Sequence, residues 1–254
     1  MSTLQAVQVD SYHVRRIICC LRSVRNAMAV NPKPSLMKPK DWSPNQVAKR
    51  DRIVQAASRL MVRDGIHACT ARTISAECGF STSSIHYYFR DIDEILDLAI
   101  RRVIDRFLGE VQQAAAEYDD PIRALWAATY AYIERTSDSA RAADEFGTRH
   151  APMVWFEYQA RSLRIGDIST AKELAARGAA YFVELVTHCD VEEAALKADS
   201  LYCALLGAGL RDSMARRPTS EWVREILLAH GLPIPEAESL RASKPKRAKK
   251  SAAG

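Results

Sequence analysis

Residues Cys69–Phe89 read CTARTISAECGFSTSSIHYYF, and this stretch decides the fold. Its first half predicts a short helix, because Thr70 is a good N-cap and Ile74 and Cys78 form an apolar pair at i, i+4. Gly79 follows as the residue that best tolerates a left-handed turn. A short amphipathic helix and a tight turn are therefore expected here.

The second half predicts another short helix. Ser81 is its N-cap, and the first turn holds Thr82, Ser83 and Ser84, whose small hydroxyl side chains suit a surface that approaches base edges and phosphates closely. Two short helices joined by a tight turn are the layout of a DNA-reading helix-turn-helix.

Helix signals continue on both sides. Ser43-Pro44-Asn45-Gln46 combines an N-cap, proline at the first helical position and a capping-box glutamine, so a helix is expected from here to Gly65. Asp91-Ile92-Asp93-Glu94 is interpreted as a second capping box that opens a helix continuing towards Gly109.

With these flanks, about sixty residues resemble the TetR family of bacterial one-component transcription regulators. The first helix carries the pattern Arg52, Ile53, Val54, Ala56, Ala57, Leu60, Met61 and Gly65, which leads into Thr70, Ile74, Gly79, Tyr88 and Phe89. An isolated helix-turn-helix pattern is a weak signal, whereas this ordered set of apolar, capping and aromatic positions is specific. A shorter resemblance of Tyr88-Phe89-Arg90-Asp91 and Leu205–Leu210 to the choline-sensing branch does not name an effector.

Two positions depart from the common family pattern. His86 stands where the family usually has tyrosine, and Ile92 stands where it usually has lysine. Both positions normally face phosphates, so the contacts with DNA are expected to differ here. Arg90 offers a replacement charge, and a neutral His86 still donates one hydrogen bond.

The resemblance implies a homodimer that binds double-stranded palindromic operator DNA with Ser81–Tyr88 in the major groove. The implied base or phosphate contacts are Ser81, Thr82, Ser83, Ser84, His86 and Tyr87, and the implied phosphate-positioning residues are Thr70, Arg72, Tyr88 and Arg90. It also implies an unknown small-molecule effector that shifts the spacing of the two DNA-binding parts.

Composition agrees with an all-α fold. Hydrophobic residues make up 48% of the 254 residues, glycine and proline number 10 each, and no strand-like alternation competes with the helical patterns. Residues 1–50 hold nine Lys and Arg against two acids, and residues 241–254 hold six against none. The positive charge therefore lies at the ends, which suits contact with phosphate, although solubility alone also explains the tail.

Other functional classes find little support. The six cysteines show no zinc spacing and are expected to be small buried side chains in a reducing cytoplasm, so neither a metal nor a cofactor is predicted. A glycine-rich phosphate loop, a G-x-S-x-G elbow and an H-E-x-x-H motif are all missing from the sequence, which argues against an enzyme. No apolar run is long enough for a membrane span or a signal peptide.

Punctuation divides the chain into four parts. Residues 1–43 are expected to form a basic, disordered extension, 44–108 the DNA-binding domain, 109–235 a helical effector-binding and dimerisation domain, and 236–254 a basic disordered tail. Helices are expected in the third part at Pro121–Thr136, Met153–Leu163, Thr170–His188, Val191–Arg216 and Glu221–His230. Three explanations of the extension stay open. Translation begins at Met28 or Met37, so that the native protein lacks the extension; or the extension is a basic arm that touches DNA; or it forms a helix on a membrane surface.

Two surfaces are expected in the third part. Leucines interleaved with small residues predict a dimer surface in the last two helices, with an ordinary core helix as the alternative; the residues are Leu201, Leu205, Ala208, Trp222 and Ile226. An apolar effector pocket is expected among Trp126, Tyr130, His150, Trp155, Phe156, Tyr158 and Tyr181, although such aromatic stripes are more often plain core.

The sequence therefore predicts a cytoplasmic transcription regulator, mainly a repressor, that a small molecule releases from its operator. One alternative is a nonspecific or architectural DNA-binding protein whose basic ends do the binding and whose affinity falls steeply with salt. Another is an enzyme or carrier whose ligand leaves DNA affinity unchanged.

Overall fold

The computed structural model describes residues 42–136, 151–212 and 218–236, and within these ranges all regular structure is helical. The all-α prediction is therefore confirmed. The elements are α2 (Pro44–Asp64), a 3-10 turn η1 (Ile66–Ala68), α3 (Ala71–Cys78), α4 (Thr82–Tyr88), α5 (Ile92–Ala115), α6 (Pro121–Thr136), α7 (Ala151–Ile165), α8 (Ser169–His188), α9 (Ala194–Asp212) and α10 (Thr219–Ala229).

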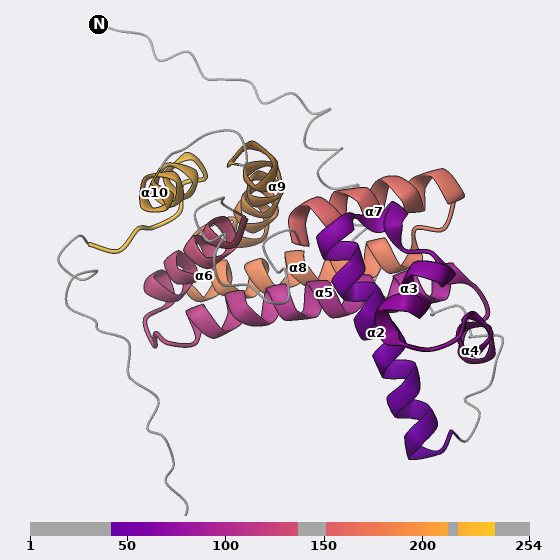
Figure 1. The fold of residues 1–254 in the computed structure, drawn as a ribbon. Coiled ribbons are helices and arrows are strands. Elements are labelled where there is room, and N and C mark those ends of the chain that lie inside the picture. Colours follow the sequence, from indigo (N-terminus) through magenta and orange to yellow (C-terminus); the bar gives the residue numbers. More distant parts are fainter. Residues whose placement is uncertain (1–41, 137–150, 213–217, 237–254) are drawn as a thin grey trace, which may run out of the picture.

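Figure 1 shows a small head and a larger body joined by one long helix. The head comprises α2, η1, α3 and α4, the body comprises α6 to α10, and α5 packs against α2 at one end and α6 along the other. The sequence placed the end of this helix near Gly109, but α5 continues to Ala115 because Val111 and Ala115 are buried against the body. The predicted boundary at residue 108 thus falls inside a continuous helix.

Local side-chain caps begin the head helices. The capping box at Ser43 and Gln46 is confirmed, with the serine backbone N–H donating to Gln46 Oε1 over 2.9 Å. At the start of α5, Asp91 accepts from the backbone N–H of Glu94 over 2.9 Å. The return bond differs from the predicted box, because the Glu94 carboxylate accepts the N–H of Arg90 instead of that of Asp91.

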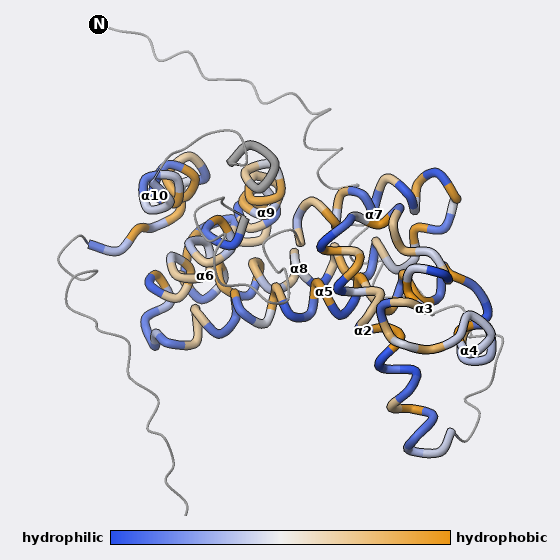
Figure 2. Tube along the Cα trace, in the orientation of Figure 1, coloured by the Kyte–Doolittle hydropathy of each residue, from blue (hydrophilic) through white to orange (hydrophobic). Residues whose placement is uncertain are grey.

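The core of the head lies between α2, α3 and α4. Ile53, Met61 and Ile74 are completely buried, and Ile85 is only 2% exposed. In Figure 2, hydrophobic and hydrophilic residues alternate along these helices, and the free end of α2 is mostly hydrophilic. Burying several large aliphatic side chains, each worth about 1.5–3 kcal/mol, fixes α3 and α4 on the longer α2.

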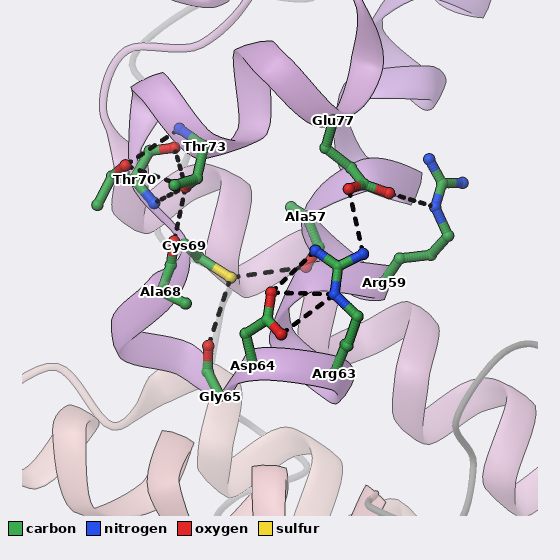
Figure 3. A network of polar contacts seen from close by, with 10 residues as sticks. All are labelled: Ala57, Arg59, Arg63, Asp64, Gly65, Ala68, Cys69, Thr70, Thr73 and Glu77. Atoms are coloured by element: carbon green, nitrogen blue, oxygen red, sulfur yellow. Dashed lines mark hydrogen bonds and ion pairs between the residues drawn. The ribbon is translucent and has the colours of Figure 1, made fainter.

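Polar contacts near the C-terminal end of α3 link this helix to α2, as Figure 3 shows. Glu77 on α3 accepts from Arg59 over 3.0 Å and pairs with Arg63 over 3.4 Å. Cys69 lies between the helices with its thiol directed at the carbonyl of Ala57, and burial raises its thiol pKa to about 12. This cysteine is therefore inert packing, as the sequence predicted.

The other described cysteines are not all alike. Cys78 is buried like Cys69, Cys189 is half-buried, and Cys203 on α9 is exposed. The expectation of uniformly buried cysteines is wrong for Cys203, because its position on α9 faces away from the subunit core.

The body packs α8 against α9 and α5 against α6. Phe182 on α8 is completely buried, with Tyr132 of α6 and Tyr202 of α9 at ring-centroid distances of 6.0 and 5.8 Å. The predicted limits of α6, α7, α8 and α10 are close to the observed ones, whereas α9 begins at Ala194 instead of Val191. The predicted end of that helix at Arg216 lies outside the described residues. The turn before it uses left-handed backbone at Asp190 and Glu193.

A row of polar residues spaced by four fastens α5 to α7 and α8. Asp93 pairs with Arg161, Asp97 accepts from the Tyr158 hydroxyl, Arg101 pairs with Glu173, and Asp105 pairs with Arg177. We call these four contacts the α5 ladder. Because each rung joins α5 to one of two body helices, the ladder sets the lengthwise position of α5.

No helix in the described part of the chain combines the length and apolar character needed to cross a membrane.

Candidate nucleic-acid interface

The start of α4 presents the hydroxyl-rich surface that the sequence predicted. Ser81, Thr82 and Ser83 are exposed, and Ser84 is half-buried. The Ser81 hydroxyl accepts from the backbone N–H of Ser84 over 3.2 Å and lies 2.9 Å from the hydroxyl oxygens of both Ser83 and Ser84. These hydroxyls are thus held in a compact group and remain open to an approaching base edge or phosphate.

Buried side chains at the end of α4 hold this surface in place. Ile85 faces the head core, and Phe89 is 3% exposed beneath the guanidinium of Arg50, 4.7 Å from the ring centroid. Arg50 also pairs with Glu94 over 2.5 Å. The end of α4 is therefore held on α2 through Phe89 and Arg50, and Arg50 in turn joins α2 to α5.

An aromatic group lies beside α4. His86 is exposed and Tyr87 is 54% exposed, whereas Tyr88 is half-buried. Trp42 packs on both tyrosines, with ring centroids 6.2 Å from Tyr87 and 5.2 Å from Tyr88, and Gln46 donates to the Tyr87 hydroxyl over 3.3 Å. The sequence analysis did not include Trp42 in this group. Its position directly before the N-cap Ser43 was the one signal that it lies at the start of α2.

Of the predicted phosphate-positioning residues, Thr70 and Arg72 lie at the exposed start of α3 and Arg90 lies just before α5, whereas Tyr88 ends α4 and is half-buried. Thr70 caps α3 by accepting from the Thr73 N–H over 3.2 Å, and Arg72 is exposed with no carboxylate partner within the described residues. Arg90 is instead paired with Asp91 over 2.6 Å, which raises the pKa of its guanidinium and offsets part of its charge.

Ile92, where the resemblance places a lysine, is half-buried and packs against the core cluster. It contributes no charge to this surface.

The body contains a narrow apolar cavity between α5, α6, α7 and α9. Its volume is about 20 Å³, and its walls include Phe107, Tyr132, Trp155 and Leu206. About 10–15 Å³ accommodates one water molecule, so this cavity is closed to anything larger in the described conformation.

Among the predicted effector residues that the structure describes, only Trp155 lines this cavity. Tyr158 is buried, and its hydroxyl donates a hydrogen bond to Asp97 Oδ1 over 2.5 Å. The Tyr130 hydroxyl donates to Glu134 Oε1 over 3.5 Å. Tyr181 is half-buried, and burial raises its pKa to about 12. Trp126 and Phe156 are half-buried, while His150 lies outside the described residues. The cavity residues Phe107, Tyr132 and Leu206 were missed because only tertiary packing brings them together.

The residues predicted for the dimer surface are mostly interior. Leu201 and Leu205 are 0% exposed, Ala208 and Trp222 are each 5% exposed, and Ile226 is half-buried. Leu201 and Leu205 therefore belong to the core of their own subunit, the alternative that the sequence left open. The outer faces of α9 and α10 carry exposed Cys203 and Leu228, the latter 51% exposed.

Comparisons with known proteins connect the head to DNA-binding regulators. Residues 53–99 match the family model described as bacterial regulatory proteins, tetR family. The HTH-type transcriptional regulator HbdR of Aromatoleum sp. (strain CIB) is 32% identical over 84 residues, which are 33% of this chain and 37% of that protein. The HTH-type transcriptional repressor KstR2 of Mycolicibacterium smegmatis is 25% identical over 122 residues, 48% of this chain and 55% of the relative.

The chain thus spans about two fifths to about half the length of these curated relatives. Similarity of fold extends further. A putative transcriptional regulator from Saccharomonospora viridis, solved in complex with choline, superposes with a TM-score of 0.57 at 18% identity, covering 72% of this chain and 96% of that one. At this identity the likeness concerns the fold of head and body together.

Proposed function

We propose that this chain, whose head matches the TetR family of bacterial transcription regulators, is a homodimeric repressor released from its operator by a small molecule. In this proposal residues 44–108 bind DNA, and residues 109–235 bind the effector and form the dimer. The proteins it matches include a regulator and a repressor.

The observation that carries the proposal is the exposed group of hydroxyls on a firmly held α4. Ser81, Thr82 and Ser83 reach solvent, while Ile85 and Phe89 fix the helix from behind. Hydroxyl groups donate and accept hydrogen bonds, so such a surface can contact both base edges and phosphates in a major groove. One seven-residue helix contacts few bases, so specificity requires two copies related by two-fold symmetry.

The dimer is proposed to form through the outer faces of α9 and α10. Leu228 is one of the large exposed apolar residues of the body. Replacing Leu228 by arginine should shift the dimer towards monomer in light scattering. The same change at Leu163, which is 70% exposed on α7, serves as the control. A mass unchanged by Leu228→Arg contradicts this placement.

Effector release is proposed to involve opening of the body cavity. Because the cavity holds little more than a water molecule, a larger ligand selects a conformation in which the surrounding helices separate. Since α5 forms one wall and also packs on α2, that separation can alter head spacing. The complex of the structural relative with choline supports ligand binding by this fold.

Genome-wide mapping of bound sites, followed by titration of the best site against a scrambled sequence, tests the function. A repressor retains its preference for the palindrome after removal of residues 1–37 and 241–254. Nearly equal affinity for both sequences, lost steeply with salt, would instead support a nonspecific binder. Ligand binding without any change in operator affinity would point to a carrier.

A further inference from the structure

A second and much larger cavity lies where the head meets the body. It has a volume of about 580 Å³ and is bordered by η1, the first turn of α5 and the C-terminal half of α7. We call it the junction cleft. Small-molecule sites commonly have about 300–1,000 Å³, so the cleft has the size that the closed body cavity lacks.

Much of the lining of the junction cleft is apolar. It includes Ile66, Ile92, Leu96 and Ile165, and Ile165 is 52% exposed. Ile92 is the residue that replaces the lysine of the family pattern. The departure therefore gives the cleft an apolar wall where the relatives' pattern would place an ammonium group.

Two lining residues of the junction cleft are cationic. Arg161 and Arg164 both belong to α7; Arg161 is paired with Asp93, and Arg164 is exposed with no carboxylate partner among the described residues. The acidic group in the lining, Glu157, accepts from the backbone N–H of Ile66 over 2.9 Å, so the lining holds two guanidinium groups against one carboxylate. An arginine without a carboxylate partner beside an apolar wall matches a molecule with an acidic head and an apolar tail.

We propose that the junction cleft binds an amphipathic organic anion, with its carboxylate on Arg164 and Arg161 and its apolar part against Ile92 and Ile165. A DNA phosphate fits this site less well, because a phosphodiester backbone offers nothing to cover the isoleucines. A free acid of medium chain length offers a carboxylate to the arginines and an apolar chain to the isoleucines.

Binding at this site also has a consequence for regulation, which rests on the proposed function. Arg161 pairs with Asp93 in the first turn of α5, the uppermost rung of the α5 ladder next to the head. A bound carboxylate competes with Asp93 for the guanidinium. Weakening this rung loosens the head against the body and lowers operator affinity.

Calorimetric titration of the full chain with octanoate and with octan-1-ol tests the site. Octanoate should bind more tightly than the alcohol, and Arg164→Gln should weaken octanoate about five- to tenfold by removing a charged hydrogen-bond donor that is partly screened by solvent. Lys172→Gln, which removes an exposed cation from α8, is the matched control and should change nothing. Failure of octanoate to bind, or equal binding to Arg164→Gln, would overturn the site.

Operator titrations separate this inference from the proposed function. Saturating octanoate should weaken operator binding by the wild type severalfold but not by Arg164→Gln, and without octanoate both proteins should bind DNA equally. Octanoate binding with unchanged operator affinity would overturn the competition with Asp93. Lower DNA affinity of Arg164→Gln without octanoate would place this arginine on the DNA backbone instead. Absence of any preferred operator would contradict the proposed function while leaving the calorimetric result intact.

Discussion

The head and the body are built from the same kind of helix, yet they are specified differently. In the head, Ser43, Thr70, Ser81 and Asp91 each cap the helix that follows within three residues of sequence. In the body, Asp120 caps α6 by accepting from the N–H of Arg123, but the N-cap residues of α8 and α10, Ile168 and Pro218, make no side-chain cap bond. Body helices distant in sequence meet through large apolar side chains such as Phe182. The head therefore depends more on local caps, and the body more on long-range packing.

The largest effect is expected from the body core. Phe182→Ala should lower the free energy of unfolding by about 3–5 kcal/mol, because it leaves a cavity among Tyr132, Tyr181 and Tyr202. Denaturant unfolding of this variant beside Ile85→Ala in the head measures how far the two regions are coupled. Both changes should shift one shared transition, since α5 and its buried residues connect both cores. Two separate unfolding transitions, each shifted by only one of the substitutions, would show that the head and the body unfold independently.

A large effect on binding without an effect on folding is expected at α4. Ser83→Glu places a carboxylate against DNA and should weaken operator binding at least about 100-fold, roughly 2.7 kcal/mol, while the melting temperature stays unchanged because Ser83 is exposed. Fluorescence anisotropy with labelled operator measures it. Gln113→Glu, at an exposed position of α5 in the body, adds the same charge as a control. Retained specific binding by Ser83→Glu would remove α4 from the interface.

A smaller effect is expected at a cap. Thr70→Ala removes the side chain that accepts from the Thr73 N–H and should cost about 1 kcal/mol of stability. Thr187→Ala is the matched change in the body, where the hydroxyl donates to the Val183 carbonyl inside α8. Because alanine is the better helix former, this control should be neutral or slightly stabilising. Equal losses in both variants would contradict the difference between local and long-range specification.

The smallest effect concerns pH at the α5 ladder. Burial raises the pKa of Asp97 in the folded state, against hydrogen bonds from Tyr158 and Thr170 that lower it. The folded protein then holds this proton more tightly than the unfolded chain. The contribution of Asp97 to stability is greatest in acid and declines as pH rises from about 3.8 through the folded-state pKa.

Stability curves of the wild type and Asp97→Asn over this pH range test the effect. The difference between the two proteins should move in favour of the asparagine variant as pH rises. A difference that is constant, or that moves in the opposite sense, would show that the hydrogen bonds outweigh burial at Asp97.

The same contrast explains what the sequence could predict. The caps, the turn at Gly79 and the limits of α6 are written in neighbouring residues, so they were predictable, and Gly79 does adopt left-handed backbone with φ of 72°. The inward orientation of Leu201 and Leu205 was not, because an apolar stripe has the same spacing whether it faces a core or a partner. The junction cleft was also hidden, since η1, α5 and α7 meet there only after folding.

The most direct test of the central claim is selection of bound sequences from a pool of random double-stranded DNA by the purified full chain. We predict enrichment of one half-site repeated in inverted orientation, and loss of that enrichment in Ser83→Glu but not in Gln113→Glu. Recovery of sequences without a common motif, or of the same motif with Ser83→Glu, would contradict the account of α4 as the surface that reads DNA.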